Sequence, residues 1–166
     1  MTKRWRLLGA IVLGLTGPLP TAGQSETCYD VGGRFEICGL PDSFGYHPHL
    51  SSENRHEWTS QPGSYLLIAQ IGPNQIASPL TADAMRAWAE EKEQSAIYEE
   101  IELSGNPAVL QRSSGQTPKG DVSNAVAVLL EIETDLAMIL LAGFEDRQLV
   151  EARFETVLDA VRLGGQ

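Results

Sequence analysis

Alternating apolar and polar residues near the start of the chain predict a β-hairpin. Tyr29 and Val31 come before the pair Gly32-Gly33, and Phe35 and Ile37 come after it. Every second residue of a half-buried strand is apolar, and glycine tolerates the positive φ angles that a tight turn requires. We therefore expect two short antiparallel strands joined at the glycines, with the apolar side chains on one face.

The two cysteines of the chain lie at the ends of this hairpin. A three-residue turn over 32–34 places Cys28 opposite Cys38, whereas a two-residue turn places Cys28 opposite Ile37 and divides the apolar residues between two faces. Because the first register keeps the apolar residues together, we predict that pairing. An even pair of cysteines in an oxidising compartment is typical of a disulfide, so we expect a structural Cys28–Cys38 bridge.

Two segments have apolar residues at helical spacing. The first begins at Thr81, whose side chain can cap a helix N-terminus, carries Asp83 in its first turn and ends near Tyr98. The second covers residues 146–163 and ends before two glycines. The apolar face of the first helix is formed by Met85, Trp88, Ala89 and Ala96, and that of the second by Leu149, Val150, Phe154, Val157, Leu158 and Val161.

Apolar residues at every second position predict strands between the hairpin and the second helix. They fall at 57–60, 65–71, 100–104, 108–112, 122–132 and 136–144. The last of these is apolar on both faces, which requires a layer of structure on each side of it. The predicted fold is therefore α+β: an antiparallel sheet of six to seven strands flanked by two helices, an α/β/α sandwich, with the disulfide hairpin at its N-terminus.

The first residues have the order of a secretory signal peptide. Three cations among the first six residues precede a mainly apolar segment at 7–15, and small residues at 21–23 follow helix-breaking prolines. An apolar segment of this length falls short of the roughly 20 residues that a helix needs to span a bilayer. We therefore expect a cleavable signal rather than a membrane anchor.

Cleavage after Ala22, Gly23 or Ser25 fits this pattern. We take residues 1–23 as the signal peptide and residues 24–166 as one α/β domain of about 140 residues, because no linker divides the remainder. The expected compartment is the periplasm, reached by the general secretory route, with secretion from the cell as the alternative.

The chain is acidic, with 22 Asp and Glu against 12 Lys and Arg and a formal charge of −10. Loss of the signal peptide makes it more acidic still. Nucleic acids and anionic membranes are bound through clustered Lys and Arg, so neither is an expected partner. No segment of the mature chain is apolar and long enough to span a membrane. The charge favours a basic protein partner or cations.

The three histidines lie close together, in and just after a polar segment at 42–54 that we expect to be a loop. The imidazole groups of His47, His49 and His56 are ligands that zinc and copper bind in proteins. Their spacing matches no known metal-binding motif, and a flexible loop is a poor cage for a metal. Periplasmic zinc or copper binding is therefore an alternative function. The preferred function, given below, requires no cofactor.

The sequence contains no recognisable catalytic motif. Ser113-Ser114-Gly115 lacks the G-x-S-x-G pattern of a nucleophile elbow, and the segment 115–120 lacks the spacing of a phosphate-binding loop. Carboxylates grouped at 90–91 and 99–102 fall at exposed positions of their predicted elements. We therefore expect a protein that is not an enzyme.

Three motifs resemble those of the PsbP-like superfamily. They are the hairpin end Phe35-x-Ile37-x-x-Leu40-Pro41, the turn Gly105-Asn106-Pro107-Ala108-Val109, and the closing helix around Phe154-x-x-Val157-Leu158. That superfamily is named for a photosystem II extrinsic protein and includes a Ran-binding nuclear import factor and small exported bacterial proteins of the DcrB type. The resemblance covers nearly the whole mature chain and implies an accessory or binding scaffold without a shared catalytic apparatus.

The expected function is that of an exported accessory domain that binds a protein partner in the cell envelope. Loops on a rigid scaffold commonly carry recognition, and the segment from Pro41 to Gln61 combines a predicted loop with aromatic side chains. The candidate contact residues are Phe44, Tyr46 and Trp58. A small-ligand carrier, with a pocket between sheet and helix, is a further alternative.

Overall fold

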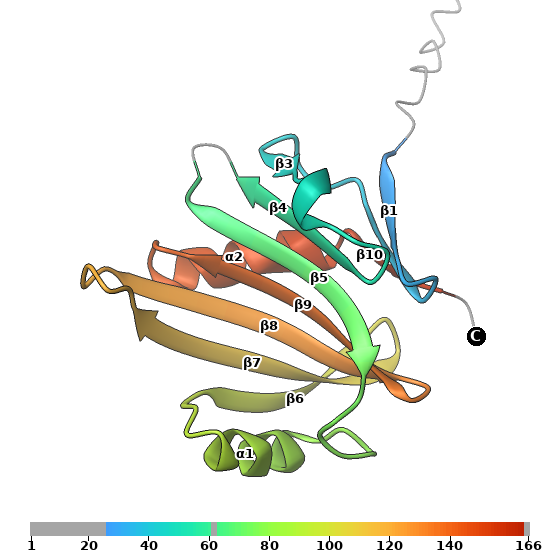
Figure 1. Cartoon of the computed structure of the whole chain (residues 1–166), viewed down its shortest axis with the longest axis vertical. Coiled ribbons are helices and arrows are strands. Elements are labelled where there is room, and N and C mark those ends of the chain that lie inside the picture. The colour runs from blue at the N-terminus through green and yellow to red at the C-terminus, as the bar shows by residue number, and fades with distance from the viewer. Residues whose placement is uncertain (1–25, 61–62, 165–166) are drawn as a thin grey trace, which may run out of the picture.

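The computed structural model describes residues 26–60 and 63–164. In this part of the chain two sheets and two helices form the α+β architecture that the sequence predicts (Figure 1). The predicted sheet of six to seven antiparallel strands is confirmed and has seven. The expected signal peptide, residues 1–23, lies outside the described residues, and neither described helix is long and apolar enough to cross a membrane.

The main sheet contains seven antiparallel strands, which are β3 (Phe44–Tyr46), β4 (Arg55–Ser60), β5 (Tyr65–Pro73), β6 (Ile97–Leu103), β7 (Asn106–Gln116), β8 (Val122–Ile132) and β9 (Asp135–Gly143). Their order in the sheet is β3-β4-β5-β9-β8-β7-β6. After β5 the chain crosses to the far edge, and the meander from β6 to β9 then brings it back beside β5 (Figure 1). β9 is thus the central strand of the sheet, and it pairs with β5 on one side and β8 on the other.

The N-terminal hairpin has the predicted register. β1 (Cys28–Val31) pairs with β2 (Phe35–Cys38), so that Cys28 lies opposite Cys38, and a disulfide joins the two. The turn residues Gly32-Gly33 both have positive φ angles, which glycine adopts without steric cost. The predicted disulfide hairpin is therefore confirmed.

The second helix is shorter than predicted. α2 (Arg147–Leu158) ends early, and β10 (Val161–Leu163) follows it as the third strand of the hairpin sheet. The prediction of a helix as far as residue 163 is therefore wrong. Val161 lies opposite Ile37 of β2 and is only 4% exposed, so the free edge of β2 supplies a partner that helical spacing does not reveal.

Helix α2 and the hairpin sheet together cover one face of the main sheet, with α2 lying behind β5, β9 and β8 (Figure 1). Val150, Phe154 and Val157 of α2 are almost completely buried. They belong to the same apolar cluster as Val128 and Ile139 of the main sheet. Hairpin, helix and main sheet therefore share one core on this face.

Helix α1 (Ala82–Glu91) packs on the opposite face, at the β6 edge (Figure 1). Thr81 is its N-cap as predicted, because its hydroxyl accepts a hydrogen bond from the N–H of Ala84 at 3.1 Å. The helix ends before the predicted limit at Tyr98. Glu93 adopts a positive φ of 54°, and this left-handed residue turns the chain out of the helix and into β6.

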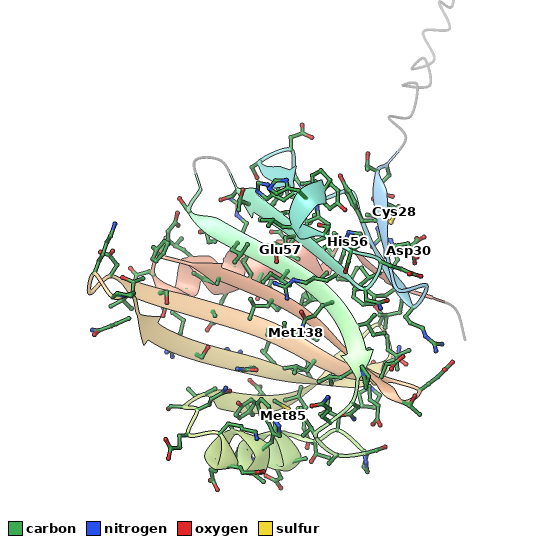
Figure 2. All side chains as sticks on the ribbon, in the orientation of Figure 1. Cys28, Asp30, His56, Glu57, Met85 and Met138 are labelled. Atoms are coloured by element: carbon green, nitrogen blue, oxygen red, sulfur yellow. A yellow bond between two sulfur atoms is a disulfide. The ribbon has the colours of Figure 1, made fainter. Side chains whose placement is uncertain are left out.

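Because α1 is short, it covers its face of the sheet only in part. Met138 lies on this face with Met85 of α1, and it is half-buried, as are Leu66 and Leu140 (Figure 2). Ile139 points to the other face and is completely buried. β9 is thus fully enclosed only on the α2 side, and its apolar residues beyond the reach of α1 remain partly exposed.

Candidate functional site

Most of the segment from 41 to 60 has regular secondary structure. β3 pairs with β4 so that Tyr46 lies opposite Trp58, and a 3-10 turn, η1 (Pro48–Leu50), lies between the two strands. The prediction of a loop over 42–54 is therefore wrong at β3 and η1. Pairing with β4 makes β3 the edge strand of the main sheet, although its local composition is typical of a turn.

Side chains from three strands form an aromatic cluster, which consists of Tyr29, Tyr46, His56 and Trp58. Tyr29 of β1 has its ring centroid 4.5 Å from that of Tyr46 and 5.3 Å from that of Trp58. Tyr46 and Trp58 are cross-strand neighbours with centroids 5.6 Å apart. Rings at these separations attract one another beyond the burial of their area. The cluster therefore joins the N-terminal hairpin to the edge of the main sheet.

His56 is hydrogen-bonded at both ring nitrogens. Nε2 lies 2.7 Å from the carbonyl oxygen of Asp30, and Nδ1 lies 2.9 Å from the hydroxyl of Tyr46 (Figure 2). A carbonyl oxygen only accepts, so Nε2 carries a proton and donates it to Asp30. His56 thus links β4 to β1 through a hydrogen bond. Because both ring nitrogens are hydrogen-bonded, neither is free to bind a metal.

The other two histidines lie apart from His56. His47 has Nε2 2.7 Å from the hydroxyl of Thr59, which is on the opposite face of the sheet from His56, and its ring centroid is 5.7 Å from that of His49. In the described part of the chain, the one compact group of potential metal ligands contains Cys28 and Cys38, which are joined as a disulfide. The structure does not bring the three predicted metal ligands together, and zinc or copper binding by this segment stays a prediction.

The three predicted partner-binding residues differ in exposure. Phe44 is 8% exposed and Trp58 is 1% exposed, whereas Tyr46 is half-buried. Phe44 and Trp58 cannot contact a flat partner surface directly. Both line a cavity, so a partner reaches them only by inserting a group into it.

This cavity, called here the acidic cavity, lies between the hairpin and the β3–β4 edge and has a volume of about 660 Å³. Its volume falls within the range of ligand pockets in proteins. Aromatic side chains form part of its wall, and two carboxylates border it. The residues that define it are Glu26, Tyr29, Asp42, Phe44 and Trp58.

The indole N–H of Trp58 is buried without a hydrogen-bond partner among the described residues. The Tyr98 hydroxyl under α1 is the other buried side-chain group of which this is true. Buried polar groups are paired in most proteins, so each unpaired one calls for a structural explanation. Trp58 differs from Tyr98 in that it lines a cavity.

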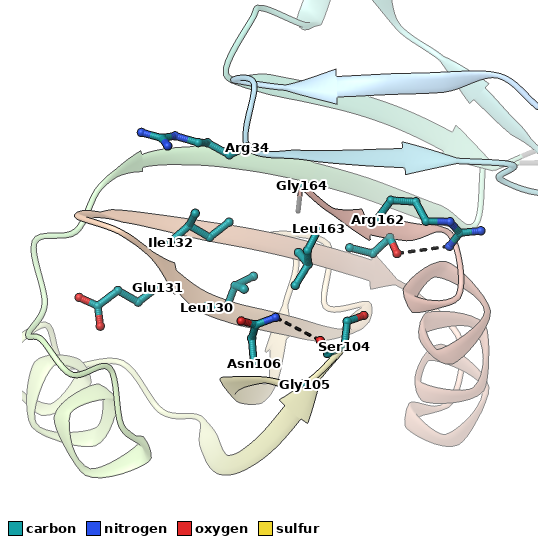
Figure 3. Close-up of a pocket in the computed structure, with 11 residues that line it drawn as sticks. Arg34, Ser104, Gly105, Asn106, Leu130, Glu131, Ile132, Arg162, Leu163 and Gly164 are labelled. Carbon is teal, nitrogen blue, oxygen red and sulfur yellow. Dashed lines mark hydrogen bonds between the residues drawn. The ribbon is translucent and has the colours of Figure 1, made fainter. Parts of the chain in front are cut away.

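A second cavity of about 610 Å³ lies between β10 and the β6–β7 turn (Figure 3). Its floor is apolar and includes Leu130 and Leu163. Arg34 at its border pairs with Glu133 at 2.8 Å, and Arg162 donates to backbone carbonyl groups and lies 3.8 Å from Glu26. Its two cations are therefore already engaged within the protein.

The titratable groups with displaced pKa values do not form an acid–base pair within the described residues. Burial raises the pKa of Tyr98, and burial together with a hydrogen bond to Glu145 raises the pKa of Tyr65. A hydrogen bond from Ser78 lowers the pKa of Glu131. Tyr65 lies opposite Gly143 at one end of β9, Glu131 lies opposite Leu136 at the other end, and Tyr98 is on the edge strand β6, whereas catalytic sites bring such groups together.

Glu26, Tyr29 and Asp42 are among the lining residues of the acidic cavity that are absent from the sequence-based candidates. The predicted hairpin register places Tyr29 on the apolar face, but no local pattern relates β1 to β3. Glu26 and Asp42 stand at opposite ends of the hairpin segment, and only the disulfide-closed register brings both to one side. The predicted disulfide was the sequence feature that could have indicated this proximity, since it holds the two ends of the hairpin together.

Comparison with known proteins identifies no matching family model and no matching curated protein. Solved structures do match. The Ran-binding protein Mog1p of Saccharomyces cerevisiae superposes with a TM-score of 0.57 at 9% identity, over 83% of this chain and 95% of Mog1p. Cyanobacterial PsbP, or CyanoP, from Synechocystis superposes with a TM-score of 0.56 at 15% identity, over 89% of this chain and all (100%) of CyanoP.

A protein from Bacteroides thetaiotaomicron matches with a TM-score of 0.56 at 11% identity, over 82% of this chain. This chain spans only about half, 47%, of that protein. Identities this low show a common fold and no more than that. The fold that the sequence motifs resemble is nevertheless confirmed: this chain has the fold shared by PsbP and Mog1p.

Proposed function

We propose that this protein is an exported, non-enzymatic accessory module that binds a protein partner in the cell envelope. The binding surface consists of the aromatic cluster and the acidic cavity beside it. The observation that carries the proposal is the aromatic cluster, in which the partly exposed rings of Tyr29 and Tyr46 lie beside a cavity of about 660 Å³.

The half-exposed tyrosines of this surface suit protein recognition. Tyr29 and Tyr46 pack ring against ring, and Tyr46 is held by its hydrogen bond to His56. Tyrosine side chains fixed in this way lose little conformational freedom on binding, and they are enriched among the residues that dominate interface energies. The cluster therefore offers a rigid contact next to a cavity that can receive a protruding group.

The fold supports a binding role. Mog1p, which shares the fold, is a Ran-binding protein. The same scaffold can therefore present a protein-binding surface, although function depends on the site and not on the fold.

Export is supported by the disulfide. Disulfides persist in the periplasm and outside the cell and are rare in the reducing cytosol. The Cys28–Cys38 bridge lies directly after the expected cleavage position, in the described part of the chain. An oxidising compartment is consistent with this bridge and with the signal-like N-terminal sequence.

Site-specific photo-crosslinking in living cells tests the proposed surface. Tyr46 or Tyr29 is replaced with the photoreactive residue p-benzoylphenylalanine, and matched controls carry it at Ile97 or Leu149, which are 56% and 55% exposed on other surfaces. We expect one covalent adduct of defined mass from both tyrosine positions, because a partner on this surface contacts both rings.

The control positions are expected to give no such adduct. Identification of the same protein from positions 29 and 46, and not from 97 or 149, supports the proposal. Identical adducts from all four positions, or none from the two tyrosine positions, would show that this surface binds no specific protein.

A further inference from the structure

We infer that the free edge of β10 receives an extended segment of a partner protein, which adds to the hairpin sheet as a fourth strand. The segment enters the cavity between β10 and the β6–β7 turn, called here the β10 groove (Figure 3). The residues that define this groove are Asn106, Leu130, Ile132, Val161 and Leu163. The groove is separate from the aromatic cluster, so this inference goes beyond the proposed function and stands or falls independently of it.

The backbone of β10 has hydrogen-bonding groups that point away from β2. In an antiparallel pair, every second residue exchanges its N–H and C=O bonds with the neighbouring strand. Gly164 faces β2 in this way, because its N–H donates to the carbonyl of Arg34 at 3.1 Å. The carbonyl of Ala160 also faces β2 and accepts a hydrogen bond from it at 2.8 Å. The backbone groups of Val161 and Leu163, which alternate with these residues, therefore point to the free edge.

These outward groups are available to another strand. The described residues provide no hydrogen-bond partner for the N–H or the C=O of Leu163. The carbonyl of Val161 accepts only from the neighbouring Arg162 side chain, at 3.3 Å. An antiparallel segment with one residue opposite Leu163 would satisfy both of its groups. Main-chain bonds of this kind provide the affinity when a peptide adds to a sheet edge.

The groove beside this edge has the volume and the apolar floor that such a segment needs. Its volume is about 610 Å³. Ile132 and Leu163 are half-buried in its lining and pack against the core that contains Leu130. Side chains of a strand alternate between its two faces, and neighbouring strands alternate together. Partner side chains opposite Val161 and Leu163 would therefore contact this apolar floor.

Arg162 indicates the charge of the central residue of the segment. Its side chain is 51% exposed, and its contact with Glu26 is long, at 3.8 Å. A partner residue opposite Arg162 points outward with it, and an acidic side chain there forms a favourable cross-strand pair. The groove therefore fits a segment with the order apolar, acidic, apolar.

A second copy of this chain fits the edge less well than such a segment. Two β10 strands paired about a two-fold axis at their central residue would place two copies of Arg162 opposite each other. Like charges directly opposite on neighbouring strands are destabilising. The β6–β7 turn also borders the far side of the groove, which leaves it suited to a single extended segment.

The free edge of β6 differs from that of β10. It carries Glu99, Glu100 and Glu102, and the carbonyl of Tyr98 accepts a hydrogen bond from Arg86 of α1 at 3.1 Å. Charged side chains and a covering helix are common means by which proteins prevent pairing at an edge strand. β10 carries one charged residue, and its edge borders a groove.

Backbone amide signals of the isotope-labelled mature protein, with the disulfide intact, report on the edge. The probe is an acetylated and amidated peptide Thr-Val-Glu-Val-Thr, whose valines can lie opposite Val161 and Leu163 and whose glutamate can lie opposite Arg162. We expect this peptide to shift the amide signals of Val161 and Leu163 in a saturable manner. Signals of β6, at the far edge of the main sheet, should not shift.

N-methylation of the peptide distinguishes strand pairing from apolar contact alone. A methyl group on a valine nitrogen removes an N–H that bonds to β10, and it should weaken binding at least about tenfold. The glutamate N–H points away from β10, so its methylation is the matched control and should leave the affinity nearly unchanged. Lysine in place of the glutamate should weaken binding about two- to fivefold.

Leu163→Pro tests the same hydrogen bonds from the protein side. Proline lacks the N–H that faces the groove, and the bonds between β10 and β2 lie on the neighbouring residues. This variant should bind the peptide at least about tenfold more weakly than wild type. Leu163→Ala keeps the N–H and is the matched control, and it should bind more tightly than Leu163→Pro.

Equal losses of affinity on methylation of the valine and glutamate nitrogens would overturn the inference, whether or not Leu163→Pro folds. So would β10 signals that stay fixed at millimolar peptide, or shifts at β6 in their place. Shifts of the β10 signals with protein concentration, in the absence of peptide, would show that a second copy occupies the groove and would also overturn it.

Discussion

Replacing Cys28 and Cys38 together by alanine is expected to lower the free energy of unfolding by about 3 kcal/mol. The disulfide closes a loop between residues 10 apart in the sequence, and the reduced unfolded chain regains the entropy of that loop. The same bridge holds the strand that carries Tyr29, so the aromatic cluster should loosen as well. Urea unfolding followed by tryptophan fluorescence measures the change in stability.

Reduction supplies the matched control for this variant. Wild-type protein in excess dithiothreitol should unfold at the same urea concentration as the double alanine variant, and the variant should not respond to the reductant. A variant as stable as the oxidised wild type would show that the hairpin is held by its strand pairing with β10 and not by the bridge.

Phe154→Ala is expected to cost about 3–5 kcal/mol of stability. Phe154 is 2% exposed and belongs to the cluster in which α2 contacts both sheets. Truncation to alanine leaves a void that Val150 and Val157 cannot fill, because the same helix fixes their positions. Since a whole domain is stabilised by only about 5–15 kcal/mol, this loss is a large share of the total.

The control lies on the same helix. Leu149 is 55% exposed, so Leu149→Ala should change the free energy of unfolding by no more than about 0.5 kcal/mol. Comparison of the two variants by urea unfolding separates core packing from helix propensity, since both introduce alanine in α2. A Phe154→Ala variant that loses no more stability than Leu149→Ala would contradict the packing of α2 on the sheet.

Elements with strong local signals could be predicted from the sequence. The hairpin register followed from two glycines flanked by alternating apolar residues, since a one-residue slip would divide those residues between two faces. The cap at Thr81 followed from the residue type alone. In each case the information lies within a few residues of chain.

Elements that depend on distant partners could not be predicted. β10 exists because β2 has a free edge beside it, and Val161 fits the apolar face of a helix as well as it fits a strand. β3 has only three residues and lies within a polar segment, and it becomes a strand by pairing with β4. Local propensity is a weak guide where tertiary pairing decides the conformation.

The candidate site likewise combines features that local sequence reveals with features that depend on the fold. Tyr46 and Trp58 stood out as aromatic residues in a polar segment, but their separate roles follow from burial that only the fold determines. The histidines illustrate the converse. Three nearby imidazoles suggest a metal site, yet His47 contacts Thr59, which lies on the opposite face of β4 from His56 because successive residues of a strand alternate between faces.

The native mass of the protein released from the periplasm without chelator tests most directly whether it is an exported partner-binding module. The account predicts an oxidised chain that lacks the signal peptide and carries a protein companion. Tyr46→Ala should abolish that companion, and Ile97→Ala should retain it. Added mass equal to zinc or copper, lost when His47, His49 and His56 are replaced by alanine, would contradict the account, as would a bound small molecule in place of a protein.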